Sequence, residues 1–483
     1  IFMLLFLPLL LAGWYFLNWK KKFQLAQGYL IGMSLWFYAY ANLQYLWLLL
    51  FSCLIGWLLS CLPEKIFSEK GKKVLTGVGC VFHLGLLGYF KYSNFFLENL
   101  NTVFHTDFPM LQILLPVGIS FYTFQQLAYL IDRCRGDAPR DSFFDYLTFM
   151  VYFPQLLQGP ILLRSEFMGQ LKEPERRRFH AERFSEGIQF FVFGLAKKVL
   201  LADTLAKAVN YGYSNVSMLD SISALLLAVG YLTELYFDFS GYCDMAVGLG
   251  KMIGLEVAEN FDAPFHSASV KEFWRRWHMT LGRFFTRYVY IPLGGNRRGK
   301  MRTLCNVMIV MLLSGLWHGA AWTFVLWGFL HGVGMIWDNL EHPHLPKKWM
   351  RQAATFAYVC MTFVFFRAES IAQGFDVLKS IVSLKWNGFV FQMASALDMT
   401  ECYMITKALS MKLPGLLSWF WLGIFVVLIA ICFRVLSGEK VSGVVALQRQ
   451  KGYGRLYPVL LAVLFTWSMI SMTGVSEYLY FSF

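Results

Sequence analysis

Long apolar segments recur along nearly the whole chain, and short polar stretches rich in lysine and arginine separate them. A helix of about 20 apolar residues spans the hydrocarbon core of a bilayer. The pattern therefore predicts an all-α, polytopic integral membrane protein with roughly ten to twelve transmembrane helices of ~20 residues each. The predicted crossings lie at about residues 1–17, 25–61 (a hairpin), 74–90, 111–131, 186–202, 221–239, 353–366, 417–435 and 456–472.

Two further apolar segments do not fit a straight crossing. Residues 143–161 have basic residues on both sides and contain the helix breakers Pro154, Gly159 and Pro160. Residues 303–337 are flanked in the same way, which predicts a hairpin that enters and leaves from one side with His318 near its tip. Irregular backbone at membrane depth is tolerated only where protein or a cavity surrounds it. Both segments are therefore predicted to be re-entrant.

The composition agrees with this class, because 57% of the 483 residues are hydrophobic and only 15% are charged. The first seventeen residues lack the basic region and the small-residue cleavage site of a signal peptide, so we expect them to be retained as the first span. The polar segments contain no pattern typical of an independent domain. We expect residues 1–483 to form a single membrane domain, with core motifs in 143–337 and an extracytoplasmic loop at 367–416.

The distribution of lysine and arginine predicts the topology. Basic clusters lie at residues 20–22, 65–73, 133–140, 164–183, 271–302, 347–351 and 434–455. Such clusters gather in cytoplasmic loops. The loops at 171–183 and 285–302 are therefore expected inside, whereas residues 385–405 and 477–483 are expected outside. The same rule explains the net charge of +13 without a nucleic-acid partner.

Several kinds of site are excluded by their missing motifs. The nine cysteines are scattered, with no pair at metal-ligand spacing, so we expect no metal. Neither a GxSxG elbow nor an HExxH motif occurs, which argues against a serine hydrolase and a zinc peptidase. Residues 294–300 match part of a phosphate-binding loop, but Met301 replaces the magnesium-binding hydroxyl. A basic turn is the favoured interpretation.

The strongest candidates for chemistry are two histidines. His318 lies in the apolar hairpin, where an imidazole is costly to bury and is therefore a functional candidate; the alternative is a core histidine bonded to a carbonyl group. His278 ends an aromatic and basic stretch, and the alternative there is a solvated histidine of an interfacial helix. A third, His331, would lie ~20 Å from His318 along a continuous helix, so the two share a site only if the hairpin breaks.

Two acidic residues, Asp238 and Asp244, lie at the end of a long apolar run. Carboxylates in such a place must be paired or hydrated. They could therefore orient a histidine or an arginine. The alternatives are structural pairing and capping of a helix start.

Six short motifs occur in order along the chain: Phe153-Pro154-Gln155-Leu156-Leu157-Gln158-Gly159-Pro160-Ile161, Phe239-Ser240-Gly241-Tyr242-Cys243-Asp244-Met245-Ala246, Glu259-Asn260-Phe261-Asp262-Ala263-Pro264-Phe265, Phe273-Trp274-Arg275-Arg276-Trp277-His278, Tyr290-Ile291-Pro292-Leu293-Gly294-Gly295 and Gly315-Leu316-Trp317-His318-Gly319-Ala320-Ala321-Trp322. Their order and spacing resemble the bacterial membrane-bound O-acyltransferase (MBOAT) family over essentially the whole chain. Within the family, the chain most resembles the alginate and peptidoglycan O-acetylation branch.

The resemblance implies an O-acyltransferase that moves an acyl group, acetyl in this branch, from a cytoplasmic thioester to a hydroxyl outside. The products would be O-acetylated cell-surface polysaccharides or exopolysaccharides. His318 matches the family's membrane-depth histidine and is expected to be the general base, while His278 matches the second histidine and is expected to position the donor. The expected donor-binding residues are Trp274, Arg275, Arg276, Trp277, Asp238, Asp244, Trp317 and Trp322.

The donor, acetyl-CoA or an acyl carrier, is a substrate, so no bound cofactor is implied. The sequence contains no SGNH-type esterase domain, and the resemblance therefore implies transfer to a separate extracytoplasmic SGNH-type partner or directly to a polysaccharide. The expected location is the bacterial cytoplasmic membrane. Two alternatives remain open: D-alanyl transfer in the teichoic acid pathway, and a polytopic transporter or flippase whose buried histidine is structural.

Overall fold

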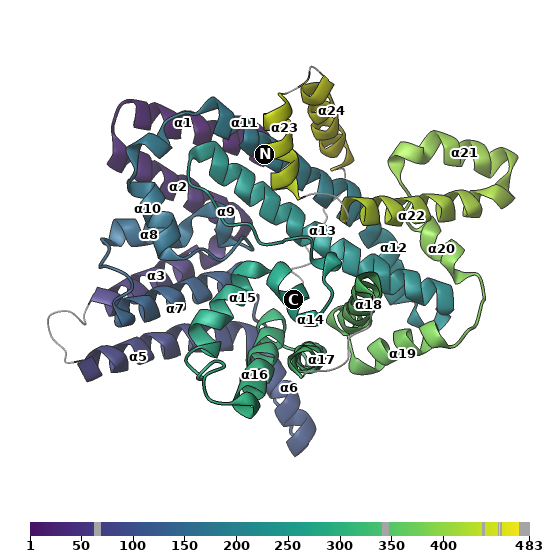
Figure 1. Cartoon of the computed structure of the whole chain (residues 1–483), viewed down its shortest axis with the longest axis horizontal. Helices are drawn as coiled ribbons and strands as arrows, with labels where there is room; N and C mark the ends of the chain where they lie inside the picture. The colour runs from purple at the N-terminus through teal and green to yellow at the C-terminus, as the bar shows by residue number, and fades with distance from the viewer. Residues whose placement is uncertain (62–68, 341–346, 437–439, 453, 455, 473–483) are drawn as a thin grey trace. The chain divides into compact units, whose positions relative to one another are not determined.

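A computed structural model of the chain describes residues 1–61, 69–340, 347–436, 440–452, 454 and 456–472 (Figure 1). Every regular element in these residues is a helix, which confirms the predicted all-α fold. Within the described residues, six helical runs are long and apolar enough to cross a membrane: Phe2–Trp19, Phe23–Cys61, Lys70–Phe104, Ser221–Ile253, Lys300–His318 and Pro414–Val435. The protein is therefore polytopic, while ten to twelve crossings stays a prediction. Residues 477–483, expected outside, lie beyond the described residues.

The chain divides into two compact units. Unit 1 comprises Ile1–Phe191, Ala246–Glu259 and Arg283–Ile291, and unit 2 comprises Val192–Met245, Asn260–Gly282 and Pro292–Phe483. Both candidate histidines belong to unit 2. The expectation of a single membrane domain over residues 1–483 stays a prediction.

Unit 1 contains the N-terminal helices. These are α1 (Leu7–Trp19), α2 (Phe23–Asn42), α3 (Leu46–Cys61), α5 (Glu69–Leu87), α6 (Ser93–Phe104), α7 (Ile119–Arg135), α8 (Phe143–Val151), α9 (Phe153–Leu156), α10 (Arg164–Lys172) and most of α11 (Ala181–Ala196). The predicted span at 111–131 is wrong at its start, because helix α7 begins only at Ile119. Pro116 and the left-handed Gly118, with φ of 76°, hold the preceding chain out of a helix.

The segment at 143–161 is broken, as predicted. Helix α8 ends at Val151, the following Tyr152 has ψ of 108°, and the short helix α9 begins with Pro154 in its first turn. At Gly159 a Cβ atom would lie 2.3 Å from the carbonyl oxygen of Pro154, so only glycine permits this turn. Its depth in the membrane stays a prediction.

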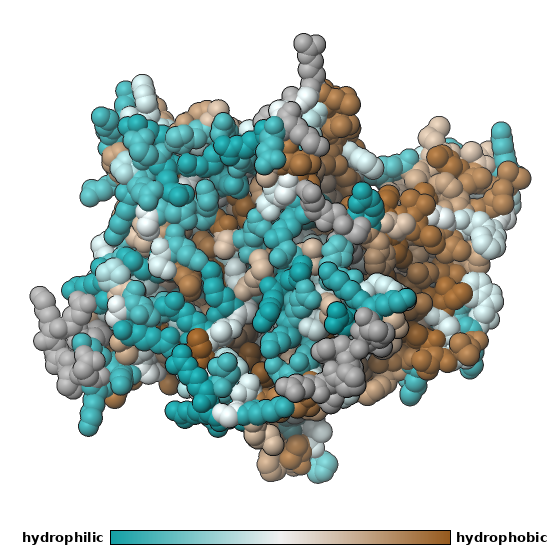
Figure 2. All heavy atoms as spheres, viewed as in Figure 1, coloured by the Kyte–Doolittle hydropathy of each residue, from teal (hydrophilic) through white to brown (hydrophobic). Residues whose placement is uncertain are grey.

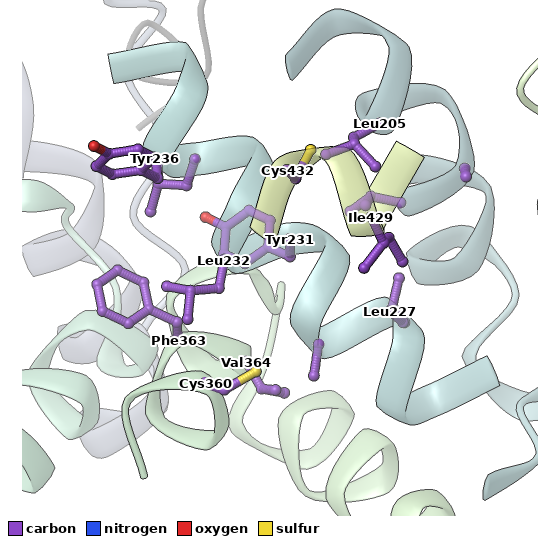
Figure 3. Close-up of a cluster of buried hydrophobic side chains, with 14 of the residues drawn as sticks. Leu205, Leu227, Tyr231, Leu232, Tyr236, Cys360, Phe363, Val364, Ile429 and Cys432 are labelled. Atoms are coloured by element: carbon purple, nitrogen blue, oxygen red, sulfur yellow. The ribbon is translucent and has the colours of Figure 1, made fainter. Parts of the chain in front are cut away.

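Unit 2 contains α12 (Asp203–Ser214), α13 (Ser221–Ile253, to Met245), α14 (Val270–Arg276), α15 (Met279–Phe285, to Gly282), α16 (Lys300–His318), α17 (Trp322–Asn339), α18 (Lys348–Arg367), α19 (Ile371–Val382), α20 (Phe389–Ser395), α21 (Tyr403–Lys412), α22 (Pro414–Leu436), α23 (Val441–Lys451) and α24 (Leu456–Ser471). Its core brings together side chains of α12, α13, α18 and α22, among them Leu205, Leu232, Phe363 and Cys432 (Figure 3). Lipid is as apolar as these side chains, so close van der Waals packing holds the helices together.

The predicted hairpin at 303–337 is present as the packed helices α16 and α17, while its entry and exit on one side of the membrane stay a prediction. Glycines allow the two helices to pack closely. A Cβ atom on Gly315 would lie 2.3 Å from the carbonyl oxygen of Phe324, and one on Gly328 would lie 2.5 Å from that of Met311. Helix α16 ends at His318 and α17 begins at Trp322, so the chain is not helical between them.

The segment at 367–416 is largely helical, since it contains α19, α20 and α21. It is tied to the start of α13, because the carboxylate of Asp220 accepts hydrogen bonds from the backbone N–H groups of Asn387 and Gly388, each at 3.1 Å. Apolar side chains of α21 and α22 are exposed, including Met404 and Trp419, and this side of unit 2 is brown in Figure 2. Its location outside the membrane stays a prediction.

We expect cysteine labelling to place two exposed positions of unit 2, 296 and 385, on opposite sides of the membrane. Asn296→Cys, in a loop between basic residues, should react with a membrane-permeant maleimide but not with an impermeant one added outside. Lys385→Cys should react with the impermeant reagent. The exposed Cys305 is first replaced by serine to remove background labelling. Labelling of position 296 from outside in sealed cells would contradict the predicted topology.

Candidate active site

His278 lies in a strained turn between α14 and α15. Helix α14 starts at the cap residue Ser269, whose hydroxyl accepts a hydrogen bond from the Glu272 N–H group. It ends before Trp277, and His278 then adopts φ of 45°, a left-handed conformation that is rare for a side chain of this size. Backbone strain of this kind persists only where surrounding contacts enforce it.

Those contacts come from Asn260. Its backbone oxygen accepts from the Met279 N–H group at 2.9 Å, and its side-chain oxygen lies 3.3 Å from Nδ1 of His278. The same side-chain oxygen accepts from the backbone N–H and the hydroxyl of Thr280, at 3.0 and 2.9 Å. On the other side, the Asn260 amide donates to Sγ of Cys243, in α13, at 3.4 Å.

His278 is buried, with 1% of its surface exposed, so the alternative of a solvated interfacial histidine is wrong. Burial lowers the pKa of His278 to about 3, and its imidazole is therefore neutral at physiological pH. The ring stands edge-on to Phe239 with centroids 4.7 Å apart.

His318, the last residue of α16, lies beside His278. The two ring centroids are 6.4 Å apart, and Trp317 contacts both rings. His318 also stands edge-on to Trp327 and Phe366, with centroid distances of 5.2 and 5.1 Å. The structure thus brings together the two histidines that the sequence predicted as catalytic. Two buried imidazoles within an aromatic wall can move a proton while limiting access of water.

The third histidine, His331, reaches the same cluster because the hairpin breaks at residues 319–321. Its ring contacts Trp327, which also contacts His318. The Trp274 indole donates to Nδ1 of His331 at 3.2 Å, so that nitrogen carries a lone pair. Nε2 lies 2.9 Å from the hydroxyl of Thr362, which donates to a backbone carbonyl group. His331 is therefore a neutral histidine with its proton on Nε2.

The predicted donor-binding residues lie in different surroundings. Trp277 and Trp317 are buried, with 3% and 4% of their surface exposed, whereas Arg275 is exposed. Arg276 pairs with Glu272 at 2.8 Å. Trp322, the first residue of α17, is 56% exposed, so it is the least enclosed of the predicted tryptophans. Their role in donor binding stays a prediction.

Asp238 and Asp244 lie within α13 rather than at its start, so the helix-capping alternative is wrong. Asp244 pairs with Lys197 at 2.6 Å, and Asp238 pairs with Lys198 at 2.5 Å. Structural pairing, the other alternative, is confirmed.

The loop at 294–300 is a basic turn, as favoured from the sequence. Gly294, Gly295 and Gly299 have positive φ, and α16 starts at Lys300. The part of the chain that the structure describes contains no strand to precede a phosphate-binding loop. The amide of Asn306 fixes the turn by donating to the carbonyl oxygen of Gly295 at 2.9 Å.

Sequence reasoning did not single out Asn260, Thr280, Thr362 or Phe366. Asn260 stands in one of the quoted motifs, so a signal was present for that residue. The place of Thr280 and Thr362 in the site becomes visible only in the structure. Each forms a hydrogen bond with a residue distant in sequence, Thr280 with Asn260 and Thr362 with His331.

Comparison with known proteins identifies the family. Residues 135–374 match the model of MBOAT, the membrane-bound O-acyltransferase family. The chain is 35% identical to a peptidoglycan O-acetyltransferase of Helicobacter pylori over 417 residues, covering 80% of this chain and 79% of the relative. It is 39% identical to a probable alginate O-acetylase of Azotobacter vinelandii over 383 residues, covering 77% and 74%.

A teichoic acid D-alanyltransferase of Streptococcus thermophilus is less similar, at 28% identity over 253 residues, which cover 50% of this chain and 58% of the relative. The order of similarity agrees with the resemblance inferred from the motifs. Helices able to span a membrane, a buried histidine pair and extended sequence identity lead to the same assignment: this chain is an O-acyltransferase that belongs to the membrane-bound O-acyltransferase family.

Proposed function

We propose that this protein transfers an acetyl group from a cytoplasmic thioester to a hydroxyl on the extracytoplasmic side of a bacterial cytoplasmic membrane. The acetyl group serves the O-acetylation of a cell-surface polysaccharide or an exopolysaccharide. The observation that carries the proposal is the buried pair of His278 and His318, with ring centroids 6.4 Å apart. The names of the two most similar relatives described above support acetyl over D-alanyl transfer.

His318 serves as the general base in this proposal. It takes the proton of the attacking hydroxyl as the oxygen forms a bond to the thioester carbonyl carbon. The carbon–sulfur bond then breaks, and the proton passes to the leaving thiolate, so that an ester and a thiol result. The aromatic wall of Trp317, Trp327 and Phe366 limits water near the thioester and so disfavours its hydrolysis.

The donor is acetyl-CoA or an acylated carrier, and it approaches from the side of the basic turn at 294–300. A cluster of arginine and lysine suits the phosphates that both kinds of donor carry. The acceptor is the serine of an SGNH-type partner outside the cell, which passes the acetyl group on to the polysaccharide. Direct transfer to the polysaccharide is the other outcome of the test.

Acetyl transfer in proteoliposomes tests the proposal. Radiolabelled acetyl-CoA is enclosed with the purified protein, and an SGNH-type partner or a polysaccharide is added outside. We expect label on the outer acceptor and release of free CoA, both lost in His318→Gln. A transporter or flippase would produce no thioester turnover. Absence of labelled acceptor with every donor and acceptor would refute the proposed function.

A further inference from the structure

The side chain of Asn260 determines which nitrogen of His278 carries the proton. The backbone N–H group of Thr280 can only donate, so the Asn260 atom that faces it at 3.0 Å must be the carbonyl oxygen. That oxygen also faces Nδ1 of His278 at 3.3 Å. An oxygen without a hydrogen cannot donate, so the neutral imidazole has its proton on Nδ1 and a lone pair on Nε2.

Nε2 of His278 is buried and has no hydrogen-bond partner among the described residues. A buried polar atom without a partner costs free energy, and a catalytic role is one of the reasons for which a native protein keeps such an atom. The ring also lies beside His318, at the site already described. The available atom of His278 is therefore an acceptor, not a donor.

We propose that Asn260 is a positioning residue that holds His278 with its Nε2 lone pair directed to a hydrogen-bond donor of the bound substrates. The donor group is an N–H or O–H of the thioester arm, because the single proton of the attacking hydroxyl passes to His318. His278 therefore cannot stabilise an oxyanion through Nε2. This inference rests on the proposed function.

The hydrogen bonds of Asn260 do more than stabilise the fold of the turn. Met279 and Thr280 already bind Asn260 through their backbone N–H groups, which fixes the turn. The additional bond to His278 orients only the imidazole. The low pKa of His278, caused by burial, keeps the ring neutral and its lone pair available.

Two substitutions of His278 distinguish the role of the Nε2 acceptor from that of the hydrogen bond to Asn260. In His278→Asn the new amide N–H can still donate to Asn260, and asparagine tolerates the left-handed backbone, but no acceptor remains at the position of Nε2. In His278→Gln the longer amide can place its oxygen at that position. We expect His278→Gln to retain about tenfold more transfer activity than His278→Asn, because only glutamine keeps an acceptor at that position and about tenfold in rate is the size of one hydrogen bond. Equal activity, or greater activity of His278→Asn, would overturn the proposal.

Substitutions of Asn260 provide the second measurement. Asn260→Asp keeps an acceptor for Nδ1 and adds a charge that favours the imidazolium, so activity should persist at high pH and be lost at low pH, with the acid limb about one pH unit higher than in the wild type. Asn260→Leu should lose activity at every pH. The titratable groups that face this site are His318 from α16 and, through Asn260, Cys243 from α13. Equal losses in both variants with an unchanged pH profile would indicate a purely structural role.

The matched control is Thr280→Val, which removes one hydroxyl donor to Asn260 and leaves the backbone donor in place. We expect an activity loss of only about two- to threefold. A direct measurement is independent of activity: ¹⁵N NMR of histidine-labelled protein distinguishes protonated from unprotonated ring nitrogens. The resonances that disappear in His278→Gln should include a protonated Nδ1 and an unprotonated Nε2. A proton on Nε2 would refute the inference even if transfer activity is present, whereas absence of transfer by the wild type would refute only the proposed function.

Discussion

Replacing His318 with alanine is expected to abolish acyl transfer and to leave a folded protein in the membrane. The ring is buried among aromatic side chains at the tip of the α16–α17 hairpin, and a general base contributes ~10²–10⁴ in rate. The substitution shortens only the side chain of the last residue of α16, and the backbone hydrogen bonds of the helix stay in place. Transfer of radiolabelled acetyl in proteoliposomes measures the loss.

The matched control is His180→Ala, which changes an exposed histidine of unit 1 and should leave activity unchanged. Size-exclusion profiles of both variants, compared with the wild type, verify folding. A loss of only two- to threefold in His318→Ala would assign the residue to packing, because it is far below the contribution of a base. Normal activity would restore the alternative of a core histidine.

The sequence predicted the hairpin and the burial of His318 because these properties are local. An apolar run carries the histidine, and the residues that follow it, Gly319 to Ala321, allow the chain to turn. The broken segment at 143–161 was equally visible from Pro154 and Gly159. By contrast, hydrophobicity alone predicts a span at 111–131, although Pro116 and Gly118 within it interrupt a helix.

Features that depend on distant partners were not predicted. The stretch that ends at His278 is basic and aromatic, and its local composition is typical of an interface, yet Asn260 holds the histidine inside. The same reason explains the two aspartates of α13. Their lysine partners lie 40 and 47 positions earlier in the chain, and no local pattern pairs them.

The second large effect is expected at Lys198, the centre of a buried charge cluster in unit 2. Its ammonium group pairs with Asp238 at 2.5 Å and with Asp203 at 2.7 Å. The buried Glu234 lies one helical turn before Asp238. Lys198→Met would remove the positive charge and leave acidic groups together in an apolar interior. We expect a loss of about 3–5 kcal/mol, seen as a lower melting temperature and a smaller yield of folded protein.

A compensated variant distinguishes lost pairing from lost packing. Lys198→Met combined with Asp238→Leu removes the lysine together with the more buried of its two carboxylate partners, and replacement of a whole buried pair by apolar side chains is often neutral. We therefore expect the double variant to recover most of the melting temperature that Lys198→Met loses. Arg178→Ala is the control, because its pair with Glu175 is exposed and should contribute less than about 1 kcal/mol. If the double variant were no more stable than Lys198→Met, the unpaired carboxylate of Asp238 would not be the cause of the lost stability, and the expected effect of the buried charge would be wrong.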